Sequence, residues 1–305
     1  MKATDVLDYK LLQQFGSLEL LARQIVEGFI VGLHKSPFHG FSVEFSEHRL
    51  YNKGESTRHI DWKLFGRTDK LFVKKYEEET NLRCQIILDT SSSMYYPSAD
   101  QNKMLFSVYA AASIIHLLRK QRDASGLALF GDTLEEYIPP KSNTAHIQRI
   151  YAMLEQQLQK PKEVKTTAAA DALHQLAEVI HKRSLVIIFS DMMENIDNHD
   201  ALFSALQHLK YNKHEVILFY TIDKKSELEF DFSNQPRKFI DTETGEVVKA
   251  YPADVKEEYL KYMKDFHHQL RLRCAQYEID LVEADIRSGF AQVLQPFLIK
   301  RGKMM

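Results

Sequence analysis

The sequence predicts an α/β protein: a doubly wound, mainly parallel sheet with helices on both faces, preceded by a small N-terminal α+β lobe. Two observations predict this fold class. From residue 83 onward, apolar runs of four to six residues alternate with segments of helical periodicity, as in βαβ units. These runs carry few polar residues, which indicates strands that are buried on both faces of a sheet.

The length of the chain predicts two domains, and its net charge argues against one class of partner. A chain of 305 residues is longer than most single hydrophobic cores, which stop growing at roughly 250 to 300 residues. We therefore expect an N-terminal domain over residues 1–80 and a larger domain over residues 81–305. The hydrophobic fraction of 44% is that of a globular protein, and a formal net charge of −2 argues against a polybasic nucleic-acid binder.

The N-terminal domain is expected to contain one helix and one antiparallel pair of strands. Apolar residues recur at helical spacing over residues 17–34, with Ser17 as the cap. Residues 41–51 alternate apolar and polar side chains, and residues 71–76 do so more loosely, which predicts the two strands. The segment between these strands is predicted to be a loop.

The larger domain is expected to alternate strands and helices in the manner of a doubly wound fold. The predicted strands are residues 86–88, 126–130, 185–189, 216–220 and 279–282. The predicted helices are residues 104–118, 147–158, 168–180, 201–209, 255–274 and 290–298. Residues 226–251 break the alternation, because phenylalanines lie among charges there and Thr244-Gly245 makes a turn. We expect this stretch to be a β-ribbon inserted near the edge of the sheet.

Oxygen-bearing side chains follow two of the buried strands. Asp89, Ser91 and Ser93 come directly after the first strand of the larger domain, and Asp191 closes the strand 185–189. Proteins with open α/β sheets bind ligands at the carboxyl ends of their strands. We therefore expect these four side chains to meet at one edge of the sheet.

A threonine is expected to join this set. Thr167 lies in the loop that opens the helix 168–180, and Thr166 is the adjacent alternative, whose structural role would be to cap that helix. Hydroxyl and carboxylate oxygens on short loops are the ligands that Mg²⁺ or Mn²⁺ takes in proteins. The sequence therefore predicts a divalent-cation site.

The motif Asp-x-Ser-x-Ser resembles the first loop of the metal-ion-dependent adhesion site of von Willebrand factor A domains. In such a site the hydroxyls of Ser91, Ser93 and Thr167 contact the cation, Thr167 directly or through water. Asp89 and Asp191 then hold the shell through waters or hydrogen bonds. This arrangement leaves one position open for an acidic side chain of a partner protein.

A second motif lies in residues 51–67. It reads Tyr-x-x-Gly-Glu, then Arg58-His59-Ile60-Asp61-Trp62-Lys63, and then Arg67. The run is similar to the signature of the bacterial family known as domain of unknown function 58, in which a von Willebrand A-like fold follows. Glu55 replaces the more usual aspartate and Gly66 replaces a common alanine, so these two positions do not support the resemblance.

The family resemblance implies a partner. Such proteins are commonly encoded beside MoxR-type AAA+ ATPases, which they are thought to help in assembling or activating other proteins. We expect a non-enzymatic, metal-dependent adaptor that binds a MoxR-type ATPase, a client protein or both. Arg58 and Asp61 are expected to form an ion pair, with Trp62 packed between the lobes. The alternative makes Arg58, Lys63 and Arg67 a docking face.

Two other functions stay open. In a metal-dependent phosphatase or hydrolase, Asp89 would be the nucleophile, although the acid expected two positions later is replaced by Ser91. In a metal-free interaction scaffold, the hydroxyls would only cap loops and helices.

The expected localisation is cytoplasmic, in a bacterium. The N-terminus lacks the apolar core of a signal peptide, and no apolar stretch approaches the roughly 20 residues that span a bilayer. No membrane span is therefore expected. The two cysteines, Cys84 and Cys274, have no metal-binding spacing, so neither a zinc site nor a disulfide framework is expected.

Overall fold

The computed structural model divides the chain into two compact units. One unit is Ile30–Asn81, and the other combines Met1–Phe29 with Leu82–Met305. The residues that the structure describes are 17–34, 48–50, 62–68, 71–74, 82–131, 133–159, 169–193, 199–241 and 245–304.

The smaller unit contains an antiparallel pair of short strands. β1 (His48–Leu50) pairs with β2 (Phe72–Lys74), so that His48 lies opposite Lys74. The prediction of a loop between these strands is wrong in part, because α3 (Trp62–Thr68) forms there. A helix of seven residues makes fewer than two full turns, which is too short for its periodicity to be recognised in the sequence.

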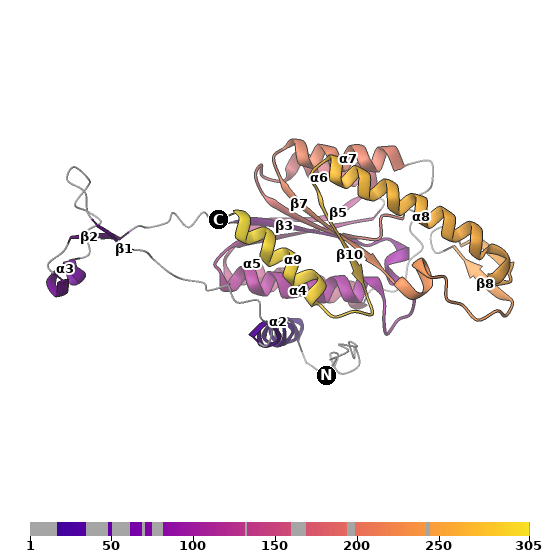
Figure 1. The fold of residues 1–305 in the computed structure, drawn as a ribbon, viewed down its shortest axis with the longest axis horizontal. Helices are drawn as coiled ribbons and strands as arrows, with labels where there is room; N and C mark the ends of the chain where they lie inside the picture. The colour runs from indigo at the N-terminus through magenta and orange to yellow at the C-terminus, as the bar shows by residue number, and fades with distance from the viewer. Residues whose placement is uncertain are drawn as a thin grey trace. The chain divides into compact units, whose positions relative to one another are not determined.

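The larger unit is built on a six-stranded sheet (Figure 1). Its strands are β3 (Arg83–Asp89), β4 (Ala124–Phe130), β5 (Leu134–Lys141), β6 (Leu185–Ser190), β7 (Glu215–Ile222) and β10 (Asp280–Asp285). Their spatial order is β10-β7-β6-β3-β4-β5, and only the β4–β5 pair is antiparallel. The predicted doubly wound, mainly parallel α/β fold is confirmed. The order reverses at β3, which places the crevice for a ligand beside the carboxyl ends of β3 and β6.

The edge strand β5 was not expected from the sequence. It reads Leu-Glu-Glu-Tyr-Ile-Pro-Pro-Lys, and only Ile138 is buried. Proline lacks the N–H that a central strand needs, so Pro139 and Pro140 argue against a strand unless it lies at an edge. β5 lies at such an edge, bonded to β4 alone.

Helices cover both faces of this sheet (Figure 1). On one side lie α4 (Lys103–Lys120), α5 (Thr144–Gln159) and α9 (Ala291–Met304), and on the other lie α6 (Ala169–Val179), α7 (His199–Tyr211) and α8 (Pro252–Gln276). All six helices were predicted, with ends that differ by a few residues. Residues 160–168, which precede α6, lie outside the described part of the chain.

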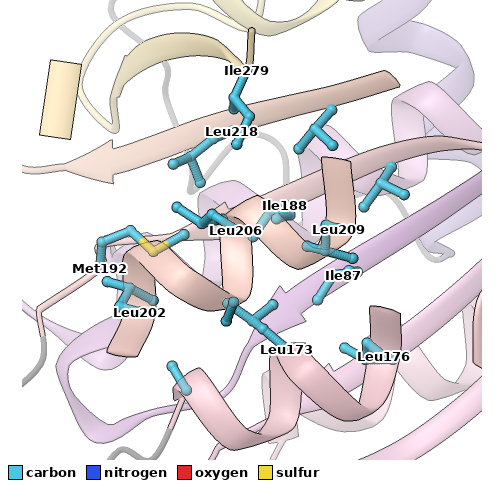
Figure 2. Close-up of a cluster of buried hydrophobic side chains, with 14 of the residues drawn as sticks. Ile87, Leu173, Leu176, Ile188, Met192, Leu202, Leu206, Leu209, Leu218 and Ile279 are labelled. Carbon is cyan, nitrogen blue, oxygen red and sulfur yellow. The ribbon is translucent and has the colours of Figure 1, made fainter. Parts of the chain in front are cut away.

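The core on the α6–α7–α8 side is aliphatic (Figure 2). Ile87, Ile188 and Leu218 point from three neighbouring strands toward Leu173 of α6 and Leu206 of α7, and all five are fully buried. Each such side chain contributes roughly 1.5–3 kcal/mol through its removal from water. This packing fixes the strand positions from which the site is built.

On the other face, α2 (Leu18–His34) packs its first turns onto the helical layer. Leu18, Leu21, Ala22 and Val26 are buried, and their spacing is that of one helix face. The Leu18 N–H donates to Oε1 of Glu155 in α5 at 2.9 Å. The predicted helix 17–34 is thus confirmed.

Between β7 and α8 the chain forms a projecting ribbon. The π-helical turn η4 (Lys224–Leu228) comes first, followed by β8 (Arg237–Ile240) and β9 (Val247–Ala250), which pair antiparallel. Because the ribbon follows β7, it lies at the carboxyl edge of the parallel strands (Figure 1).

Candidate functional site

Two aspartates lie at the carboxyl ends of neighbouring parallel strands. Asp89 ends β3, Asp191 follows the last residue of β6, and the two strands pair directly. The Ser91 N–H donates to Asp89 Oδ1 at 2.8 Å, and the Ser190 hydroxyl donates to Asp89 Oδ2. Both aspartates are 1% exposed. The Asp89 carboxylate is therefore held in one orientation by groups from both strands.

The two serines of the motif lie side by side. A 3₁₀ turn, η2 (Ser92–Tyr95), follows β3 and brings the Ser91 Oγ within 3.0 Å of the Ser93 Oγ. Ser91 is buried and Ser93 is half-buried. The structure thus brings Asp89, Ser91 and Ser93 together, while Thr167 and Thr166 lie outside the described residues, and their place in the site stays a prediction.

The buried Asp89 carboxyl is destabilised in its ionised form. Burial, and next the negative charge of Asp191, raise the pKa of Asp89 to about 7, although hydrogen bonds from Ser190 and Ser91 act in the opposite direction. Any cation beside this carboxylate lowers its pKa again, because it stabilises the charged form.

A lysine that sequence reasoning missed pairs with Asp191, the second aspartate of the site. Lys103, at the first turn of α4, lies with its Nζ 2.6 Å from Asp191 Oδ2 and 2.6 Å from Glu227 Oε1. Its side chain is 1% exposed. Burial alone lowers the pKa of an ammonium, but the charges and hydrogen bonds of the two carboxylates outweigh burial and raise the pKa of Lys103. One signal was present: Lys103 starts a helix whose next positions are all apolar or small.

The lysine connects the site to a second polar cluster. Glu227 Oε2 accepts the N–H of Asp223 at 2.6 Å, and the Asp223 carboxylate accepts two bonds from the Arg287 guanidinium, at 2.5 and 2.9 Å. Glu227 belongs to η4, and Arg287 follows β10. Hydrogen bonds thus run from the end of β6 through Lys103 to the ends of β7 and β10.

The donor set suits a hard cation better than a soft one. Carboxylate and hydroxyl oxygens are ligands for Mg²⁺ or Mn²⁺, whereas zinc sites use cysteine and histidine. Within the described ranges, no group of three or more histidine, cysteine, aspartate or glutamate side chains is placed to hold a metal ion. Cys84 and Cys274 are both buried, and burial raises the pKa of each thiol. Hydroxyl oxygens would therefore have to provide part of the coordination here.

The match to a family model decides which family this is. The model described as "Protein of unknown function DUF58" matches residues 47–269, most of the chain. The chain belongs to the DUF58 family. An uncharacterized protein of Mycobacterium tuberculosis is 25% identical over 221 residues, which cover 72% of this DUF58 protein and 68% of the mycobacterial one.

Two solved structures match parts of this DUF58 protein. An aerotolerance-related membrane protein from Bacteroides fragilis is 15% identical, with a TM-score of 0.44, and the match covers 72% of this chain and 99% of that one. The VWA domain of SpRpn10 is 16% identical, with a TM-score of 0.29 and coverage of 45% and 74%.

The predicted cytoplasmic localisation is corrected. The Bacteroides fragilis protein that matches this chain over most of its own length is described as a membrane protein. The prediction rested on the lack of an apolar N-terminal stretch, and such a lack does not define a compartment. Among the described helices, none is both long and apolar enough to cross a bilayer. No compartment is assigned to the chain.

Proposed function

We propose that this DUF58 protein is a metal-dependent protein-binding module whose site comprises Asp89, Ser91, Ser93, Thr167 and Asp191. The observation that carries the proposal is the pairing of the Ser91 and Ser93 hydroxyls, 3.0 Å apart, beside a buried carboxyl whose pKa is raised to about 7. Two neutral oxygens and a destabilised carboxylate are a donor set that a bound Mg²⁺ or Mn²⁺ would stabilise.

The chemistry of the side chains favours binding over catalysis. When bound, the cation would supply a Lewis-acidic position that an acidic side chain of a partner can fill. The serines would contribute no charge, and Lys103 already neutralises part of the charge of Asp191. The position two residues after Asp89, where a phosphoryl-transfer enzyme would need an acid, is Ser91. We therefore place the protein among interaction domains rather than among phosphatases or hydrolases.

The partner that we propose is a MoxR-type AAA+ ATPase, a client protein of that ATPase, or both. This part of the proposal is supported by membership of the DUF58 family and by the resemblance described above. A pull-down with the purified ATPase, in Mg²⁺ and in chelator, tests it, and binding that is lost in chelator is the expected result.

Calorimetric titration with Mg²⁺ and with Mn²⁺ tests the site itself. We expect binding in the wild-type protein and its loss in Asp89→Asn, which keeps the size of the side chain and removes its charge. We also expect Asp89→Asn to be at least as stable as the wild type without metal, because it removes a buried carboxylate that faces Asp191.

The matched control is Ser98→Ala, which removes an exposed serine hydroxyl a few residues after the motif. It should bind metal like the wild type, whereas the double variant Ser91→Ala, Ser93→Ala should not. The proposal fails if the wild-type protein binds neither ion at millimolar concentration.

A metal-free interaction scaffold is the second candidate. It is favoured by the ion pair between Lys103 and Asp191, which satisfies one of the two aspartates without any metal. Partner binding that persists both in chelator and in the double serine variant would select this candidate.

A further inference from the structure

The β8–β9 ribbon exposes an ordered pattern of side chains on its outer face. In an antiparallel pair, residues directly opposite each other project from the same face. Lys238 lies opposite Lys249, and Ile240 lies opposite Val247, so these four side chains share one face. Ile240 is 60% exposed and Val247 is 49% exposed. We call these four residues the ribbon face.

The opposite face of the ribbon carries Phe239, which packs on the protein, and Val248, which is 53% exposed. Phe239 stacks on Phe230 at a centroid distance of 5.8 Å and makes an edge contact with Phe232. Phe230 in turn contacts Tyr259 of α8, at 4.7 Å. These aromatic contacts fix the ribbon from behind, which leaves the ribbon face directed away from the core.

The charges on the ribbon face are unbalanced. Two lysines directly opposite each other repel, and such like-charge pairs destabilise a sheet. Neither Lys238 nor Lys249 forms an ion pair with a residue that the structure describes. An acidic group placed between the two lysines would remove the repulsion, and apolar side chains beside it would cover Ile240 and Val247.

The ribbon is also anchored next to the candidate metal site. η4, which begins the connection from β7 to β8, carries Glu227, and Glu227 is held by Lys103 together with Asp191. Phe230, two residues after η4, is the base on which the ribbon stacks. The ribbon face therefore lies at the same edge of the sheet as Asp89 and the serines.

We propose that the ribbon face is a second docking surface, which binds an acidic amphipathic segment of a partner protein. Apolar side chains of the segment cover Ile240 and Val247, and its carboxylates pair with Lys238 and Lys249. Binding at this face needs no metal. It therefore does not depend on the metal-dependent function proposed above, and the two can be tested separately.

An anionic membrane is a less suitable partner for this surface. Recognition of an anionic bilayer takes a cluster of about four to eight lysines or arginines. The ribbon face presents two, Lys238 and Lys249, which suits a narrow acidic segment better.

Fluorescence anisotropy with a labelled synthetic peptide tests the proposal. The peptide has leucines at helical spacing on one face and glutamates on the other, and a matched peptide has lysines in place of the glutamates. In chelator, we expect the acidic peptide to bind and the basic peptide not to bind. The double reversal Lys238→Glu, Lys249→Glu should weaken binding about tenfold or more, and the double variant Ile240→Ser, Val247→Ser should weaken it similarly.

The control carries the same charge change elsewhere on the larger unit. Lys141 ends β5 and Lys182 precedes β6, so both exposed lysines lie at the opposite edge of the sheet. The double variant Lys141→Glu, Lys182→Glu should bind the acidic peptide within about twofold of the wild type. Circular dichroism verifies that every variant is folded.

Three results would overturn the proposal. The first is that the wild-type protein does not bind the acidic peptide at millimolar concentration. The second is that the control variant loses as much affinity for the peptide as the ribbon variants do. The third is that the protein binds phosphatidylglycerol vesicles through the ribbon face and does not bind the peptide. Peptide binding in chelator by a protein that shows no calorimetric signal with Mg²⁺ would leave the ribbon proposal supported and the metal proposal refuted.

Discussion

At the scale of single residues, Lys103 is the side chain that joins most of the polar structure around the site. Its ammonium contacts Asp191 and Glu227, which are 88 and 124 positions away in the chain. All three groups are buried, and an unpaired buried charge costs free energy. Each group is therefore stabilised in its charged form by the others. The side chain is therefore a structural support of the site, whether or not a metal binds.

We expect Lys103→Met to lower the free energy of unfolding by about 3–5 kcal/mol, because it leaves two buried carboxylates without their cation. Urea unfolding measures the change. Lys120→Met, on an exposed lysine at the end of the same helix, is the control and should change stability by less than about 0.5 kcal/mol. Equal effects of the two variants would contradict the supporting role of Lys103.

The residues of the site differ in how far the sequence predicts them. Asp89, Ser91, Ser93 and Asp191 directly follow buried strands, and parallel strand ends meet at one edge, so local pattern and topology suffice to propose them. Lys103 and Glu227 could not be proposed in this way. Their partners are distant in sequence, and a lysine or a glutamate is usually a solvated residue. Neither residue follows a strand directly.

At the scale of elements, the contact between β4 and β5 is unusually close. Gly126 of β4 faces β5, and a Cβ built on it would lie 2.5 Å from Gln85 Oε1 and 2.6 Å from the Ile138 carbonyl oxygen. The neighbouring Pro140 nitrogen would be 2.9 Å away. The register between these strands is also irregular at this point, between Ser125 and Leu127. A side chain at this position has no space unless the edge strand moves.

Gly126→Ala is therefore expected to destabilise the protein by about 1–3 kcal/mol, the usual cost of overpacking a core. Gly28→Ala is the matched control, because nothing lies within 4 Å of a Cβ at Gly28 on α2. It should leave stability unchanged or raise it by up to about 1 kcal/mol, since alanine favours a helix. Thermal unfolding compares the two, and the opposite order of stabilities would contradict the close approach of β5.

The two elements that the sequence did not reveal share a physical cause. β5 is a strand that only an edge position tolerates, with two prolines and one buried side chain, and α3 is too short to show a period. The central strands were recognised as continuous apolar runs, because they are buried on both faces of the sheet. The long helices were recognised because burial of one face leaves a periodic pattern in the sequence. Elements that depend on their neighbours leave no such pattern.

At the scale of the whole molecule, the pair between Asp223 and Arg287 joins the end of β7 to the segment after β10. Burial would raise the pKa of the Asp223 carboxyl, but the hydrogen bonds from Arg287 and Ser226 prevail and lower it. The folded state then binds protons less readily than the unfolded state does. The pair stabilises the fold fully above the ordinary carboxyl pKa of 3.8, and this contribution is lost as the pH falls further.

We expect Arg287→Gln to reduce the free energy of unfolding at pH 7 by about 1–3 kcal/mol, because a buried carboxylate loses a charged partner. The difference from the wild type should be constant near neutral pH and should narrow below about pH 4. Urea unfolding over this pH range measures it. Arg149→Gln, at an exposed arginine of α5, should follow the wild type throughout. A difference in the free energy of unfolding between Arg287→Gln and the wild type that increased in acid would contradict the stabilising role of the pair.

The two outer strands of the six-stranded sheet bear on the behaviour of the protein at high concentration. β5 contains Pro139 and Pro140 just before its last residue, and β10 carries the acidic residues Asp280, Glu283 and Asp285. Prolines and charges on edge strands hinder the pairing of one molecule's sheet with another's. The sheet is thus protected at both ends against fibrillar aggregation.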